Sequence, residues 1–133
     1  MKDKLYLVKQ GFFKEMSYSE ETDNSIKPFI NTETDKVLID KVCKYLDSGV
    51  VIMECCGTTI DALNESNGIA GVPSLLTDGV WVWPGDLSYY VKKYKIILSD
   101  DFMSTLKQNN FNVNVNSEEI LAKSIYVDGV KLL

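Results

Sequence analysis

The fold of this chain is decided by residues 75–110, which read LLTDGVWVWPGDLSYYVKKYKIILSDDFMSTLKQNN. Asp78-Gly79 stands between two runs of apolar, β-forming residues. This dipeptide is the strongest short-range signal for a β-hairpin, because both central residues of the tight turn take positive φ. We therefore predict strands over 75–77 and 80–83. In the second strand the two tryptophans share one face and the two valines the other, so the hairpin should lie inside a sheet or against a partner.

Two capped helices should follow this hairpin. Asp86 is placed to cap the first, and its apolar residues recur at the spacing of one buried helix face. Ser99 is placed to cap the second, and the acidic pair Asp100-Asp101 lies in the first turn, where the helix dipole favours negative charge. Asn109-Asn110 should end it. The residues of the first stripe are Leu87, Tyr90, Val91 and Tyr94.

The rest of the chain adds shorter elements of both kinds. The apolar run 50–53 has no alternation, which is typical of a central strand covered on both faces. We predict an α+β fold in one domain, 1–133, with a mixed or mainly antiparallel sheet of about four to six strands and three or four packed helices. The other expected elements are a strand over 4–9, a helix from Thr34 or Asp35 to Asp47, a helical turn from Thr58 or Thr59 to Leu63, a strand near Phe111–Val113, a helix capped by Ser117 and a second Asp-Gly hairpin near the end.

The charge balance argues against several classes of function. The chain has 14 Lys, 19 acidic residues and a net charge of −5, with no His and no Arg. Proteins that grip nucleic acid normally present a basic face rich in Arg, so we expect no nucleic-acid partner. No apolar run reaches the length of about 20 residues that a membrane span needs, and the first residues lack the apolar core of a signal peptide. We therefore expect no membrane partner and a cytoplasmic location.

The same composition removes most routes to catalysis. Acid–base chemistry near neutral pH most often uses His, which this chain lacks. The three cysteines, Cys43, Cys55 and Cys56, match neither a disulfide framework nor a zinc site, so we expect buried, reduced thiols. We expect no enzyme activity, no catalytic residue, no cofactor and no metal site. One alternative remains, a carboxylate-dependent hydrolase built on Asp78 and Asp86 beside the tryptophans.

The acidic balance instead suggests a basic protein partner, because complementary fields steer association. Trp and Tyr often anchor interfaces, since they bury a large area at low entropic cost. Tyr89 lies off the helical stripe and is the aromatic residue of this segment that we expect to be most exposed. The candidate partner-binding residues are Glu20, Glu21, Asp23, Glu65, Trp83, Tyr89, Asp100 and Asp101.

The motif from Thr77 to Val91, TDGVWVWPGDLSYYV, resembles one shared by a group of small bacterial proteins, in the form TDGxWxWPxDLxYYV. The likeness covers about residues 45–110, with Asp61 and Gly71 in register. These proteins are similar to the immunity proteins of bacterial toxin systems. The resemblance therefore implies that the chain neutralises a cognate toxin by direct binding, and its partner would be a basic toxin domain. It implies no catalytic residues. A second alternative is a small homo-oligomeric module that uses the tryptophan strand as its interface.

Overall fold

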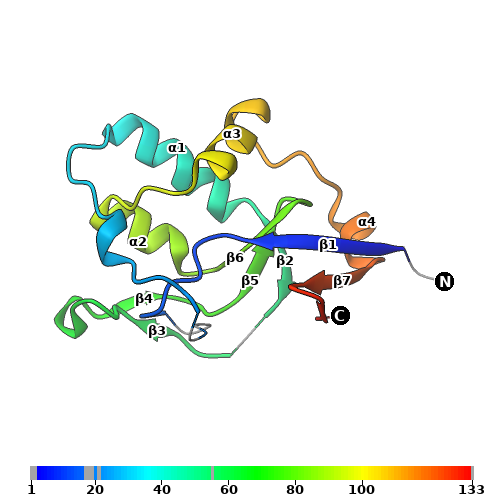
Figure 1. Ribbon diagram of the computed structural model, residues 1–133, viewed down its shortest axis with the longest axis horizontal. Coiled ribbons are helices and arrows are strands. Elements are labelled where there is room, and N and C mark those ends of the chain that lie inside the picture. The colour runs from blue at the N-terminus through cyan, green and yellow to red at the C-terminus, as the bar shows by residue number, and fades with distance from the viewer. Residues whose placement is uncertain (1–2, 17–19, 21, 55, 133) are drawn as a thin grey trace.

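The computed structural model describes residues 3–16, 20, 22–54 and 56–132, and it folds as a single α+β domain (Figure 1). This confirms the predicted fold class. The elements, in chain order, are β1 (Lys4–Lys9), the 3-10 turn η1 (Lys27–Phe29), α1 (Lys36–Asp47), β2 (Val50–Met53), β3 (Thr59–Ile60), the 3-10 turn η2 (Glu65–Asn67), β4 (Ile69–Gly71), β5 (Leu75–Thr77), β6 (Trp81–Pro84), α2 (Leu87–Tyr94), α3 (Asp100–Gln108), α4 (Ser117–Leu121), β7 (Ser124–Val127) and β8 (Val130–Lys131).

The main sheet is mixed and curled. It has six strands in the order β2-β5-β6-β1-β7-β8. β1 runs parallel to both β6 and β7, while the other neighbouring pairs are antiparallel. The first strand of the chain therefore lies between the predicted hairpin and the last hairpin. A separate two-stranded sheet, β3–β4, lies to the lower left of the main sheet in Figure 1.

The hairpin β5–β6 forms as predicted and lies inside the sheet, but its turn is wider than a two-residue turn. Thr77 pairs with Val82, and residues 78–80 lie between the two strands. Gly79 takes a positive φ of 97°, whereas Asp78 does not. Asp78 acts through its side chain instead, because Oδ1 accepts hydrogen bonds from the backbone N–H groups of Val80 and Trp81 at 3.0 and 2.8 Å. The prediction of positive φ at both positions was wrong.

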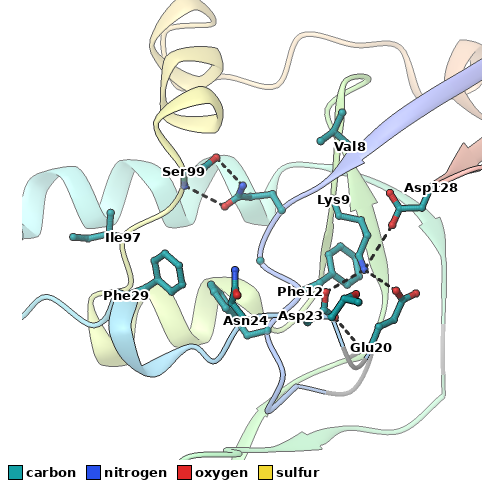
Figure 2. Close-up of a pocket in the computed structure, with 14 residues that line it drawn as sticks. Val8, Lys9, Phe12, Glu20, Asp23, Asn24, Phe29, Ile97, Ser99 and Asp128 are labelled. Carbon is teal, nitrogen blue, oxygen red and sulfur yellow. Dashed lines mark hydrogen bonds and ion pairs between the residues drawn. The ribbon is translucent and has the colours of Figure 1, made fainter.

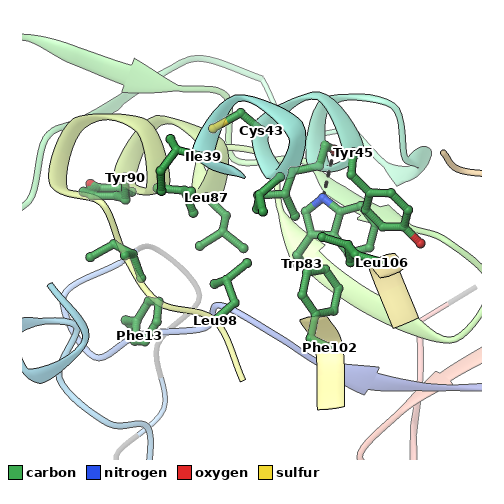
Figure 3. Packing of buried hydrophobic residues seen from close by; sticks show 14 of the residues in the cluster. Phe13, Ile39, Cys43, Tyr45, Trp83, Leu87, Tyr90, Leu98, Phe102 and Leu106 are labelled. Atoms are coloured by element: carbon green, nitrogen blue, oxygen red, sulfur yellow. Dashed lines mark hydrogen bonds between the residues drawn. The ribbon is translucent and has the colours of Figure 1, made fainter. Parts of the chain in front are cut away.

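The alternation of β6 divides the core between the two faces of the sheet. Trp83 belongs to the larger cluster and lies between Tyr45 of α1 and Phe102 of α3 in Figure 3. Its indole N–H donates to the carbonyl of Leu46 at 3.0 Å, and its ring lies edge-on to Phe102. Val82 belongs to a second cluster on the other face, with Leu7 and Ile125. Both faces of the hairpin are thus used for packing, as its composition predicted.

Capping explains where the helices begin, and two caps differ from the prediction. Asp35 and Ser99 cap α1 and α3 as expected. Asp86 precedes α2, but its side chain makes no capping hydrogen bond. α4 is capped by Asn116, one residue earlier than predicted, and ends at Leu121.

Three other local predictions were wrong. β2 was predicted to be a central strand, but it is an edge strand: it pairs with β5 on one side and contacts α4, and Val51 is exposed. Residues 59–60 form β3 rather than a helical turn, since they pair with β4. The segment around Phe111–Val113 is irregular; Phe111 has a φ of 56° and packs against the larger core.

Candidate functional site

A pocket of about 430 Å³ opens where β1 ends (Figure 2). Its wall includes the end of β1, the segment 22–24 with Glu20, the start of α3 and the β7–β8 turn. Lys9 is the central charged group of this wall. The polar residues that complete the lining include Gln10, Thr22, Asn24 and Ser99.

Lys9 meets three carboxylates. Its Nζ lies 3.5 Å from Asp23, 3.9 Å from Glu20 and 3.9 Å from Asp128. The same ammonium lies 4.8 Å from the centre of the Phe12 ring, within range of a cation–π contact. Lys9 and Asp23 are mostly covered, whereas the Glu20 and Asp128 side chains are 64% and 63% exposed. One cation therefore faces three carboxylates, and two of these remain open to solvent.

The pocket wall is held together by hydrogen bonds within the 20–24 segment and between distant segments. Glu20 donates its backbone N–H to Asp23 Oδ2 at 2.7 Å, which closes a local turn. Gln10 donates from its amide to the hydroxyl of Ser99 at 2.9 Å and accepts the Ser99 N–H at 3.3 Å, as Figure 2 shows. The start of α3 is thereby joined to the end of β1.

The structure brings two of the predicted partner-binding residues together in this pocket, Glu20 and Asp23. Glu21 lies outside the described residues. Asp100 and Asp101 are exposed in the first turn of α3. Asp100 directly follows Ser99 and lies on the rim of a separate, mainly apolar pocket of about 300 Å³ between α1 and α3. The acidic start of α3 is thus next to the Lys9 pocket, although it does not line it.

Glu65 and the two aromatic candidates lie elsewhere. Glu65 is exposed in η2, on the loop between β3 and β4, which Figure 1 shows far from α3. Trp83 is 1% exposed, so the expectation that it anchors a partner does not hold in this structure. β6 is also paired on both sides, so neither edge of the tryptophan strand is open to pair with a second copy of the chain. Tyr89 is only half-buried, but its hydroxyl is used inside the protein.

That hydroxyl contacts Asp61, a carboxylate with no exposed surface. Asp61 Oδ2 accepts from Tyr89 at 2.7 Å, Tyr94 at 2.6 Å and Asn67 Nδ2 at 3.1 Å. Its Oδ1 accepts two backbone N–H groups, of residues 63 and 64. Burial alone would raise the pKa of Asp61, but these hydrogen bonds outweigh burial and hold the pKa well below its usual range. A carboxylate that stays ionised and fully bonded serves to fasten its loop to α2 and is not poised to move a proton.

The two carboxylates of the hydrolase alternative do not face a common cleft. They lie at opposite ends of β6 and are both buried. Asp78 bonds its own turn and accepts from the Tyr45 hydroxyl at 2.6 Å, and Asp86 accepts from Thr59 at 2.8 Å. Burial raises the pKa of Asp86. Because each carboxylate is already bonded to protein groups on a different element, this pair is not arranged for glycoside hydrolysis.

The thiols and carboxylates offer no metal site among the residues described: no group of three or more of them is arranged to hold a metal ion there. Cys43 is buried, as predicted, and burial raises the pKa of its thiol to about 11. Cys56 is exposed, contrary to the prediction, and Cys55 lies outside the described residues. In the described part of the chain, every helix is too short or too polar to cross a bilayer.

Comparison with known proteins adds no relative: no protein-family model, no curated protein and no solved structure matches this chain. The resemblance to immunity proteins therefore stays a prediction. The sequence pointed to Glu20 and Asp23 through local charge. It missed Lys9 and Asp128, because only the parallel pairing of β1 with β7 brings the two ends together.

Proposed function

We propose that this chain is a binding protein of the immunity type, which neutralises a cognate toxin by covering a basic surface of the toxin domain. The observation that carries the proposal is the pocket at the end of β1, where Glu20, Asp23 and Asp128 surround one lysine. With a net charge of −5 over the chain, a basic partner is favoured both at long range and at this contact. The proposal includes the cytoplasmic location expected from the sequence, and it needs no cofactor.

The lining of the pocket also favours recognition over chemistry. Lys9 is already paired with carboxylates and an aromatic ring, so it is not free to act as a base or a nucleophile. Two of the carboxylates have largely exposed side chains, which suits contact with a second molecule. Acidic groups on such a rim mainly set the rate and specificity of association.

The test is co-expression of this chain with the product of the adjacent open reading frame, followed by affinity capture, mass spectrometry and a growth assay. The proposal predicts a stable one-to-one complex and rescue of growth from the toxicity of the neighbour. A neighbour that is not toxic and is not captured would contradict it. Sedimentation of the chain alone would separately test the homo-oligomer alternative, which predicts a concentration-dependent shift to a larger species.

A further inference from the structure

Lys9 and the side chains around it form a wall between two pockets. The first is the 430 Å³ pocket already described, and the second, of about 210 Å³, lies beside it. Lys9, Phe12, Glu20 and Asp128 line both. The two hollows therefore meet at one group of side chains, and a ligand that contacts this group can extend into either.

The second pocket is apolar apart from the shared wall. It is backed by Leu75 and Val82 of the smaller core cluster, which are buried, and is bordered by the last hairpin. The other apolar residues that line it are Val127, Val130 and Leu132. Val130 is 63% exposed, so the described residues leave this side of the pocket open. An apolar hollow beside a small number of placed polar groups is the usual composition of a binding site.

The shared wall carries more negative charge than its lysine neutralises. Lys9 supplies one positive charge against the negative charges of Glu20, Asp23 and Asp128, so these four groups sum to −2. Asp23 makes the shortest of the three contacts, and the other two, at 3.9 Å, are long for an ion pair. The oxygens of Glu20 and Asp128 are thus left with unused capacity to accept hydrogen bonds from a second cation.

We propose that the two pockets form a single site for a basic side chain of the partner next to an apolar one, with the cation between Glu20 and Asp128 and the apolar group in the hollow beside Val127 and Val130. This inference rests on the proposed function, because it names what the toxin domain would present. A guanidinium suits the place best, since its several N–H donors can be shared between the two carboxylates.

The site can be tested without the partner by NMR titration with blocked dipeptides. The probe is acetyl-leucyl-arginine amide, and its control is acetyl-leucyl-citrulline amide, which has nearly the same shape and no charge. We expect saturable shifts at the amide of Lys9 and at the methyl groups of Val127 and Val130, with binding of the arginine probe about tenfold tighter, as one charged contact commonly provides. Equal binding of the two probes, or no saturation at about 20 mM, a concentration well above the Kd of a weak ligand, would overturn the proposal.

Substitutions that remove the two exposed carboxylates should lower the affinity for the arginine probe. Glu20→Gln with Asp128→Asn should weaken binding of the arginine probe about tenfold. Asn tolerates the positive φ of 50° that Asp128 adopts, so the turn should survive. The matched control, Glu33→Gln with Asp40→Asn, removes two exposed carboxylates outside both pockets and should leave binding unchanged.

Lys9→Met should have the opposite effect. It removes the internal cation while keeping an unbranched apolar stem against Phe12, so the affinity for the arginine probe should rise several-fold. Weaker binding by a Lys9→Met variant that melts like the native protein would contradict the proposed placement of the cation.

The captured complex separates this inference from the proposed function. If the Glu20→Gln, Asp128→Asn variant binds the toxin domain as tightly as the native chain, the proposed function stands and the bipartite site is wrong. If no complex forms with any variant, the proposed function fails, and the dipeptide titration still decides whether the site binds a cation.

Discussion

Tyr89 donates a hydrogen bond of 2.7 Å from its hydroxyl to Oδ2 of Asp61, a carboxylate with no exposed surface. The contact joins α2 to the loop between β3 and β4. Burial and the neighbouring Asp61 raise the pKa of Tyr89 to about 12, so the hydroxyl stays a donor at physiological pH. Together with Tyr94, which donates to the same carboxylate oxygen, this tyrosine fastens the loop to α2.

Asp61→Asn should destabilise the protein and loosen this loop. The amide can accept from fewer of the five donors, and the variant should lose about 3 kcal/mol of unfolding free energy at pH 7, because hydrogen bonds to a buried charge are among the stronger ones. Urea denaturation measures the loss. Asp40→Asn, on the exposed face of α1, is the matched control and should change the free energy by less than about 0.5 kcal/mol.

The Asp61→Asn variant also tests how the contribution of Asp61 to stability depends on pH. The pKa of Asp61 is lower in the folded than in the unfolded chain, so its stabilisation is complete above the unfolded pKa of about 4 and is lost as the pH falls through the lowered folded value. The difference in unfolding free energy between native and Asp61→Asn protein should be constant from about pH 5 to pH 7 and shrink below about pH 4. A difference that grows in acid would contradict the assignment.

Gly49→Ala should be destabilising because a Cβ at this position would lie 2.6 Å from Cζ2 of the buried Trp83 ring. Overpacking of this kind costs about 1–3 kcal/mol. Gly71→Ala, whose Cβ would lie 3.1 Å from Asp86, is the comparison and should cost less. Tryptophan fluorescence during denaturation measures both; an equal cost at the two sites would mean that the Trp83 ring yields.

The described cysteines should differ in reactivity. Burial raises the pKa of the Cys43 thiol to about 11, so little reactive thiolate forms at pH 8. Cys56 is exposed. In a Cys55→Ser background, a thiol reagent should modify Cys56 quickly and Cys43 only on unfolding. Rapid modification of both in the native protein would show that α1 opens locally.

Reversing the charge of the acidic segment should slow association with the toxin domain. Replacing Glu20, Glu21 and Asp23 with Lys removes the attractive field at the proposed face, so the association rate at low salt should fall at least about tenfold and depend less on salt. Stopped-flow fluorescence measures the rate. Reversal of Glu33, Asp40 and Glu54, which are exposed elsewhere, is the control. Equal rates for the two triple variants would remove this segment from the interface.

Elements with strong local signals were predicted well from the sequence. The β5–β6 hairpin, α1, α2 and α3 follow from a turn dipeptide, capping residues and helical stripes. β2 was misplaced because an apolar run looks the same at the edge of a sheet as at its centre. A helical turn was predicted at residues 59–60 because two residues are too few to show the alternation of a strand, and their pairing with β4 spans η2.

Only part of the candidate site could be predicted from the sequence, because the rest depends on contacts between segments far apart in the chain. Acidic residues near Glu20 were visible as a charge cluster, and Trp83 looked like an interface anchor because sequence alone does not tell a buried aromatic from an exposed one. The register between β1 and β7 is what carries Asp128 to Lys9. No local sequence pattern predicts such a contact between residues near the two ends of a chain.

The central claim is that the face around Lys9 binds a basic protein. Hydrogen–deuterium exchange of this chain, alone and with the captured toxin domain, tests it most directly. We predict slower exchange on binding at residues 9–14, 20–24 and 127–131, with residues 61–68 unchanged. Protection confined to 61–68 and α2, or to the outer edge of β2, would contradict the claim and place the interface elsewhere.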